Sequence, residues 1–211
     1  MLALRVVAAR LRNRKFTPSE VAAMFGFTAT HVNNLIDEIA SVGVAQVGNR
    51  KRLVEYRGLA AILLAEELVY CQLKPELRYE AFKQAVATRA KRIAVSGTNL
   101  SVLVHPYRQR AQDGIRRLYE AEEAIQSRED VMQGEPCIRG TRIPAYIVAA
   151  IARAKGREEA LATYPSLELR QVELAELFAC AHPRRGRPKT TILPTEGKVV
   201  TTKVIVRSKA K

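Results

Sequence analysis

The side chains best suited to chemistry in this sequence are hydrogen-bonding and cationic groups near the N-terminus. The polar set comprises Thr28, Thr30, His31, Asn33 and Asn34, and the cationic set comprises Arg50, Lys51 and Arg52. An Asn side chain can bond adenine N6 and N7 together, and Thr or His can reach single groups on a base edge. Consecutive cations suit phosphates, although a solvated basic loop is the plainer alternative. The two sets together predict contact with DNA.

Two helices joined by a tight turn are expected over residues 16–40 to position the polar set. The Thr17 hydroxyl can accept a hydrogen bond from the N3 amide, and Glu20 can bond back to the cap. Gly26 is suited to end the first helix, and Thr28 to cap the second. Apolar residues recur at helical spacing in both segments. The pattern is typical of a helix-turn-helix.

Strand-prone segments 44–47 and 53–56 flank the cationic set. They predict a hairpin that serves as a wing and touches phosphates or enters the minor groove. Asp37 and Glu38 would repel phosphate, so the far end of the second helix is expected to tilt away from a duplex. Phe16–Ala22, Gly26–Thr28 and Tyr56–Leu59 resemble the winged helix of MerR-type regulators.

The middle of the chain carries no assigned chemistry. Apolar periodicity predicts helices over 59–73 and 75–88, a hairpin from 92–95 and 100–104, and a long amphipathic helix over 106–125. These elements are expected to position the two flanking domains or to form part of a dimer contact.

A second distinctive segment covers residues 131–144. Its glycines permit positive φ, and its prolines restrict their neighbours, which predicts a turn, a short extended segment and a helix start. The structural residues of this motif are Gly134, Pro136, Arg139, Gly140, Thr141, Arg142 and Pro144. Arg139 and Arg142 are expected either to cap carbonyls and pair with acids inside the fold, or to contact a partner.

Three short helices are predicted after the motif, over 144–154, 157–163 and 168–181. The residues expected to be buried are Ile147, Val148, Ile151, Ala160, Leu161, Val172, Leu174 or Ala175, and Phe178. A three-helix cluster of this size is marginally stable by itself, so it is expected to pair with a copy of itself or with a neighbour. Its last helix carries Glu168, Glu173 and Glu176 against Arg170, which disfavours binding to phosphates.

Residues 129–181 are similar to the homeodomain-like antitoxin domain of VapB-type antitoxins. The similarity is carried by Gly-Glu-Pro-Cys-Ile-Arg-Gly-Thr-Arg-Ile-Pro, a Glu-Glu helix and a Tyr-Pro pair before the final helix. Leu167-Glu168 departs from the polar cap usual in related sequences. The resemblance implies a type II antitoxin that represses its own operon by binding operator DNA. It also implies a partner toxin with a PIN-like ribonuclease fold.

The last 30 residues are strongly basic. Arg185-Gly186-Arg187-Pro188 contains the core of an AT-hook, with a basic linker as the simpler interpretation. The segment beyond it has strand-like content and can add to the sheet edge of a partner. The resemblance implies that PIN-like toxins hold Mg²⁺ with acidic side chains, which an Arg or Lys can satisfy instead. The expected toxin-binding residues are Lys198, Lys203, Val204 and Arg207, and a frayed basic end is the alternative.

Composition sets the wider limits. The chain has 211 residues with 47% hydrophobic content, which is enough to bury a core. Its net charge of +14 favours a polyanionic partner. Three cysteines (Cys71, Cys137 and Cys180) argue against a disulfide framework, and no apolar run is long enough to span a bilayer. A cytoplasmic protein without membrane attachment is therefore expected, and the marginal three-helix cluster adds the expectation of a homodimer.

No catalytic constellation is evident. The histidines (His31, His105 and His182) lie in separate segments, and a packed thiol explains Cys137 better than a nucleophile does. We expect no enzyme activity, cofactor, metal or small-molecule ligand. The alternatives are a MerR-like ligand-responsive regulator with a pocket in 60–128 and no toxin partner, and an architectural DNA-binding protein.

The sequence thus predicts a mainly α fold in four parts. The parts are a winged helix-turn-helix domain (1–72), a helical connector with a hairpin (73–128), a three-helix homeodomain-like domain that is expected to dimerise (129–181) and an extended basic tail (182–211).

Overall fold

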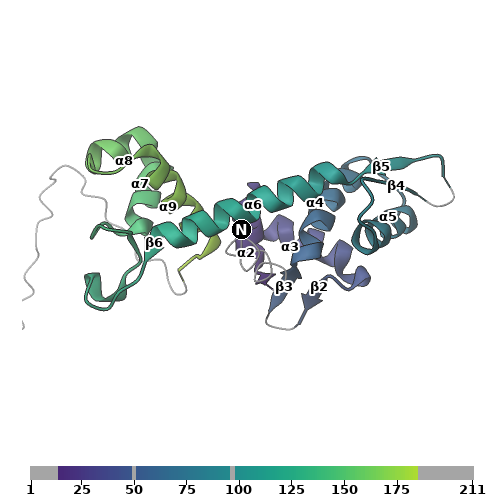
Figure 1. Cartoon of the computed structure of the whole chain (residues 1–211), viewed down its shortest axis with the longest axis horizontal. Coiled ribbons are helices and arrows are strands. Elements are labelled where there is room, and N and C mark those ends of the chain that lie inside the picture. Colours follow the sequence, from purple (N-terminus) through teal and green to yellow (C-terminus); the bar gives the residue numbers. More distant parts are fainter. Residues whose placement is uncertain (1–13, 49–50, 96–97, 185–211) are drawn as a thin grey trace, which may run out of the picture.

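The computed structural model describes residues 14–48, 51–95 and 98–184, and these residues form a mainly helical protein. Figure 1 shows two groups of elements joined by one long helix, α6 (His105–Ala124), which crosses the molecule. Within the described ranges, none of the helices combines the length and the apolar character that a bilayer crossing requires.

The first group begins with the predicted pair of helices. β1 (Lys15–Phe16) leads into α2 (Pro18–Phe25), and α3 (Ala29–Ile39) is extended by a short 3₁₀ turn, η1 (Ala40–Val42). β2 (Ala45–Val47) and β3 (Arg52–Glu55) form the expected antiparallel hairpin. β3 lies in the middle of a three-stranded sheet in the order β1-β3-β2. The strand β1 was not predicted, and it ties the start of α2 to the hairpin.

The helix ends follow from local chemistry, as predicted. The Glu20 amide donates to Thr17 Oγ1 at 3.3 Å, and the Thr17 amide donates to Glu20 Oε2 at 2.7 Å. Gly26 closes α2 with a φ of 77°, a conformation that glycine adopts without steric cost. The His31 amide then donates to Thr28 Oγ1 at 3.1 Å, which caps α3.

The middle elements complete the same core. They are α4 (Tyr56–Tyr70), α5 (Pro75–Ala87), β4 (Arg92–Ala94), β5 (Ser101–Leu103) and α6. One cluster of buried residues runs from Phe16 on β1 to Leu118 on α6. Gly114 on α6 lies so close to α2 that a Cβ there would be 2.7 Å from Phe25 Cε1. The first half of α6 is therefore packed tightly on the helix pair.

The second group has its own core between Ile125 and Ala175. It comprises β6 (Ile125–Gln126), a 3₁₀ turn η2 (Met132–Gly134), β7 (Cys137–Ile138), α7 (Ala145–Lys155), α8 (Arg157–Thr163) and α9 (Leu169–Ala181). β6 and β7 pair antiparallel, with Ile125 opposite Ile138. The predicted end of this helix was Ile125. α6 instead ends at Ala124, because Ile125 pairs with Ile138 in the sheet.

Burial in the three short helices differs from the prediction at three positions, since Ile147 is exposed and Leu161 and Phe178 are only partly buried. Ile147 was expected in the core but is 37% exposed, because the core face of α7 follows Ala145, Val148 and Ala152. Ala175, not Leu174, is the fully buried residue of α9. α9 has a polar cap despite the departure at Leu167-Glu168, since the Glu168 amide donates to Gln171 Oε1 at 2.9 Å.

α9 connects the two groups. It packs on α7 within the second group and on α2 and α6 of the first (Figure 1). Ala181 at its end is buried in the first core. The helix pair and the C-terminal group are consequently held against each other along α9.

Candidate nucleic-acid interface

The outer face of α3 presents part of the predicted polar set to solvent. Thr28, Thr30 and Asn34 are exposed. His31 is half-exposed, and its Nε2 lies 2.5 Å from Glu66 Oε2 on α4. The imidazole is thereby held against the protein, so it is less free to reach a base edge than the sequence suggested.

Asn33 and Asn34 differ in a way that the sequence did not reveal. Asn33 Oδ1 is buried, and among the residues that the structure describes it has no hydrogen-bond partner. A bidentate contact to adenine needs both the oxygen and the nitrogen of the amide. Asn34, which is exposed, therefore remains the better candidate for base contact.

The hairpin places one of its predicted cations against α3. Arg52 Nη1 donates to the Asn33 carbonyl oxygen at 3.0 Å and lies 2.9 Å from Asp37 Oδ1. Arg52 thus fixes the hairpin on the helix, a role not expected from the sequence. Lys51 is exposed, and Arg50 lies outside the described residues.

The acidic end of α3 is partly neutralised within the protein. Arg52 pairs with Asp37, and Arg78 Nη2 on α5 lies 3.6 Å from Glu38 Oε2. Carboxylates that are paired in this way repel a nearby phosphate less than free ones do. The expected tilt away from a duplex is therefore a weaker requirement than the sequence implied.

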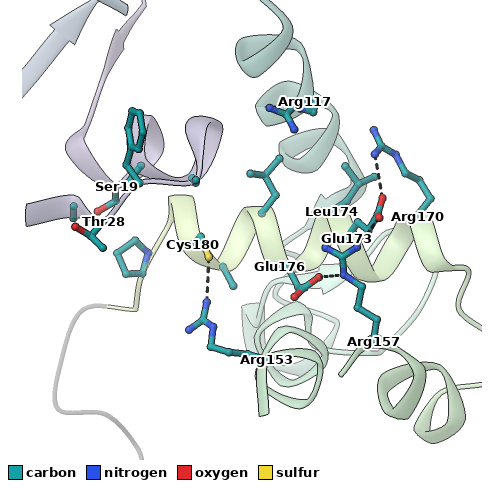
Figure 2. A pocket seen from close by; sticks show the side chains of 18 residues that line it. Ser19, Thr28, Arg117, Arg153, Arg157, Arg170, Glu173, Leu174, Glu176 and Cys180 are labelled. Atoms are coloured by element: carbon teal, nitrogen blue, oxygen red, sulfur yellow. Dashed lines mark hydrogen bonds and ion pairs between the residues drawn. The ribbon is translucent and has the colours of Figure 1, made fainter. Parts of the chain in front are cut away.

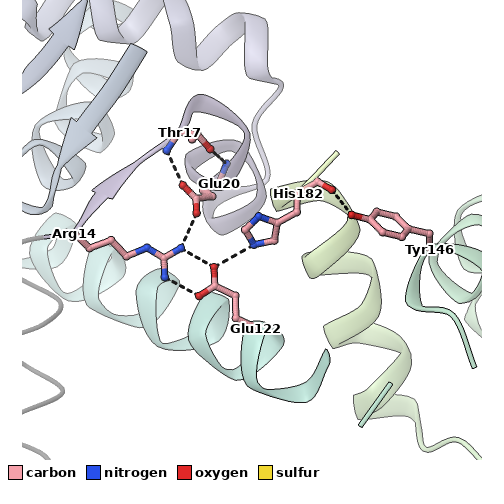
Figure 3. A network of polar contacts seen from close by, with 6 residues as sticks. All are labelled: Arg14, Thr17, Glu20, Glu122, Tyr146 and His182. Atoms are coloured by element: carbon pink, nitrogen blue, oxygen red, sulfur yellow. Dashed lines mark hydrogen bonds and ion pairs between the residues drawn. The ribbon is translucent and has the colours of Figure 1, made fainter. Parts of the chain in front are cut away.

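A polar network joins the two groups of elements (Figure 3). Arg14 bonds both oxygens of Glu122 on α6 and Oε1 of Glu20 on α2, each at 2.6 Å. His182 Nε2, just beyond α9, lies 3.1 Å from Glu122 Oε1. The Tyr146 hydroxyl on α7 donates to the His182 carbonyl at 2.6 Å. We call these five residues the interdomain network.

The electrostatics of the interdomain network are dominated by Arg14 and Glu122. Burial raises the pKa of Glu122, but hydrogen bonds from Arg14 and His182 outweigh it and lower that pKa to about 2. The hydrogen bond to Glu122 raises the pKa of Arg14 despite desolvation. Glu20, Glu122 and His182 offer ligand atoms within 4.8 Å of one another. Arg14 already bonds both carboxylates, so ion pairing explains this cluster without a metal.

Sequence reasoning did not find the interdomain network. Arg14 and Glu122 are 108 residues apart, and no spacing pattern connects them. The one local signal was Glu20, which the capping pattern singled out. Its burial at 7% exposure shows that it does more than cap a helix.

The motif loop at 134–144 is rigidly built. Thr141 Oγ1 donates to the Ile138 carbonyl at 2.8 Å and accepts from the Ile143 amide at 3.1 Å. Gly140 has a φ of 78°, as its type predicted, and Pro144 precedes α7. The Ala145 amide donates to the Pro136 carbonyl at 2.9 Å, which closes the loop. The loop therefore holds a fixed shape.

Arg139 and Arg142 project from this loop into solvent. Both are exposed, and within the described ranges neither side chain has an ion pair or hydrogen bond. The expectation that they cap carbonyls or pair with acids inside the fold is therefore wrong for the described residues. Their donors remain available to a partner.

Cys137 is fully buried, and burial raises the pKa of its thiol. A raised pKa disfavours the nucleophilic thiolate. The prediction of a packed thiol agrees with this environment.

A cleft of about 810 Å³ separates the two groups (Figure 2). One wall is formed by α2 and the start of α3, and the other by residues of α6, α7, α8 and α9. Of the residues that line it, Arg117 alone falls within 60–128, where the ligand-responsive alternative requires a pocket.

The predicted toxin-binding residues lie beyond the described part of the chain. Lys198, Lys203, Val204 and Arg207 belong to this segment, as does the Arg-Gly-Arg-Pro core.

The comparisons with known proteins give one family match, which lies in the C-terminal group, and one relative. Residues 125–179 match a family described as "Protein of unknown function (DUF433)". The chain is also 35% identical over 102 residues to "Uncharacterized protein y4eO" of Sinorhizobium fredii (strain NBRC 101917 / NGR234). That alignment covers 48% of this chain and 46% of the relative, so the chain spans about half of the relative's length. No solved structure matches the chain.

Proposed function

We propose that the protein is a type II antitoxin that binds operator DNA through α3 and the β2–β3 hairpin, and that inhibits a PIN-like ribonuclease toxin. The observation that carries the DNA-binding part is the outer face of α3. Thr30 and Asn34 are exposed there, while Asp37 and Glu38 are paired with arginines. A face of this kind offers neutral hydrogen-bonding groups to base edges, with few free carboxylates near the phosphates.

The proposed arrangement follows the general geometry of helix-turn-helix proteins. The N-terminal residues of the second helix contact base edges, and the first helix crosses the DNA backbone. Lys51 on the hairpin supplies a cation next to this face. A homodimer would place two such faces on an inverted repeat.

The toxin-binding part rests on the resemblance to VapB-type antitoxins and on two features, one of the structure and one of the sequence. The first is the rigid motif loop, which presents Arg139 and Arg142 without internal partners among the described residues. The second is the basic segment with Lys198, Lys203, Val204 and Arg207. A guanidinium pairs strongly with carboxylates, which suits an acidic metal centre.

The DNA-binding part is tested by titrating the chain's own promoter with full-length protein and with Asn34→Ala and Asn33→Ala variants. We expect Asn34→Ala to reduce discrimination between the promoter and random DNA by about 1–3 kcal/mol. Asn33→Ala, the matched control, should retain discrimination because its amide oxygen is buried. Equal effects of the two changes, or no promoter binding, would contradict the proposal.

The toxin-binding part is tested by searching the neighbouring genes for a PIN-like nuclease and co-expressing that nuclease with this protein; absence of such a gene would count against this part. Full-length protein should restore growth and co-purify with the nuclease. Truncation after Lys189 should abolish the rescue while leaving promoter binding intact. Unchanged rescue by the truncated chain would show that the tail is not the inhibitor.

A further inference from the structure

The cleft between the two groups contains an excess of arginine. Four arginines and two glutamates line it, namely Arg117, Arg153, Arg157, Arg170, Glu173 and Glu176. They come from α6, α7, α8 and α9, whereas Ser19 and Thr28 lie on the opposite wall (Figure 2). The cleft is therefore bounded by the proposed DNA-binding helices on one side and by cations on the other.

Two of the arginines are neutralised within the protein. Arg157 bonds Glu176 at 2.6 Å and Glu173 at 2.7 Å. Arg170 bonds Glu173 and also Glu120. All the carboxylates that line the cleft are used by this pair, so Arg157 and Arg170 add little net charge to it.

Arg117 and Arg153 have no carboxylate partner among the described residues. Arg117 Nη2 donates to the Met24 carbonyl at 2.9 Å, and Arg153 Nη2 contacts Cys180 Sγ at 3.1 Å. Both side chains are exposed. A guanidinium has five N–H donors in a fixed fork, so each arginine retains donors for a second acceptor. The charge that each brings to the cleft is not cancelled.

We propose that this cleft binds the phosphodiester backbone of duplex DNA beside the site that α3 reads, with Arg117 and Arg153 as the phosphate contacts. This inference rests on the proposed function. Phosphate accepts bidentate bonds from a guanidinium. Duplex DNA is the favoured source of phosphate because Thr28, at the start of α3, lines the same cleft.

The interdomain network fixes the position of one wall of the cleft relative to the other. Glu20 follows Ser19 on α2, and His182 precedes Pro183, which also lines the cleft. Both side chains belong to the network around Arg14 and Glu122. The arginines are thus fixed relative to α3, which gives the backbone contact a defined distance from the base-reading face.

The test compares two double variants. Arg117→Gln/Arg153→Gln changes the cleft, and Arg116→Gln/Lys155→Gln is the control. The control removes the same charge from the same two helices, at exposed positions that do not line the cleft. Affinity for the promoter duplex is measured from 50 to 200 mM salt. Each phosphate contact contributes about 0.9 to the slope of log affinity against log salt, so the cleft variant should lose about 2 from that slope. The control should keep the wild-type slope.

Hydroxyl-radical footprinting supplies a second measurement. The cleft variant should lose backbone protection on one flank of the site and keep it at the centre, where α3 binds. A wild-type slope and footprint, or changes equal to those of the control, would overturn the inference while leaving the proposed function intact. Absence of promoter binding by the wild type would instead refute the proposed function.

Folding of the variants is checked by thermal unfolding. If loss of the Arg117 bond to Met24 prevents folding, Arg153→Gln carries the test, with Lys155→Gln as its control. Because Arg153 contacts only an exposed thiol, this variant should fold normally and lower the slope by about 1.

Discussion

The surfaces proposed to bind DNA and the toxin differ in whether their arginines are paired. In the N-terminal group, Arg52 and Arg78 pair with the carboxylates of α3. In the C-terminal group, the motif loop presents Arg139 and Arg142 without partners among the described residues. Pairing the carboxylates of α3 leaves its outer face with neutral hydrogen-bonding groups. The unpaired arginines of the motif loop keep their positive charge available to a partner. The number of arginines in a segment thus says less about its partner than which of them are already paired.

The largest expected effect comes from breaking the connection between the two groups. Glu122→Gln should lower the free energy of unfolding by about 3 kcal/mol at pH 7, because Arg14 loses its main partner in a half-buried site. The pKa of Glu122 is lowered from 4.5 to about 2, so its contribution is complete above pH 4.5 and is lost as the pH falls towards 2. Urea denaturation at several pH values measures this difference.

Glu123→Gln is the control for this prediction, since Glu123 is the exposed neighbour on α6. It should change stability little at any pH. A Glu122→Gln deficit that stayed constant between pH 7 and pH 2 would rule out the assigned role of the carboxylate.

A smaller effect tests how tightly α6 packs on the helix pair. Gly114→Ala places a Cβ 2.7 Å from Phe25 Cε1 and 3.2 Å from Met24 Cβ. We expect a loss of about 1–3 kcal/mol from overpacking, measured by thermal unfolding. Gly48→Ala, whose Cβ would be 3.5 Å from its nearest neighbour, is the control. Equal melting temperatures for the two variants would show that α6 can shift freely.

Loss of the N-terminal cap of α3 should lower the free energy of unfolding by less than the Gly114→Ala change does. Thr28→Ala removes the acceptor for the His31 amide and should cost about 1 kcal/mol. Thr30→Ala removes an exposed hydroxyl from the same helical turn and should cost much less. Denaturant midpoints compare the two, and a larger loss from Thr30→Ala would contradict the capping role.

The smallest effect on stability is expected in the motif loop. Arg139→Gln/Arg142→Gln should leave the free energy of unfolding within about 0.5 kcal/mol of wild type, because neither side chain has a partner in the described structure. The same double variant should bind the nuclease more weakly in a pull-down. A large loss of stability would mean that these arginines serve the fold.

Helix caps and glycine turns could be predicted from the sequence. The caps at Thr17 and Thr28 and the turn at Gly26 depend on residues within a few positions, so their patterns predicted the helix ends correctly. Gly140 likewise has the positive φ expected of its type. The mainly α fold follows from the same periodicity and is confirmed.

Contacts between distant segments could not be predicted. The pairing of Arg14 with Glu122 depends on how α6 lies against α2. The burial of Asn33 Oδ1 depends on the packing around α3. Helical periodicity placed Ile147 in the core because it could not show which neighbouring face of α7 the rest of the group would cover. Each outcome is decided by tertiary packing, which the linear pattern does not contain.

α6 packs in the first core and runs directly into β6, whose Ile125 lies in the second core, so its length has a mechanical consequence. Its 20 residues extend about 30 Å at 1.5 Å per residue. A tilt of about 5° would displace one end by about 2–3 Å, which exceeds the tolerance of a hydrogen bond. A partner that tilts α6 through the C-terminal group would therefore pull Glu122, two residues from that end of the helix, away from Arg14. α6 would then act as a lever that converts binding on the C-terminal group into loss of the ion pair that joins this group to α2.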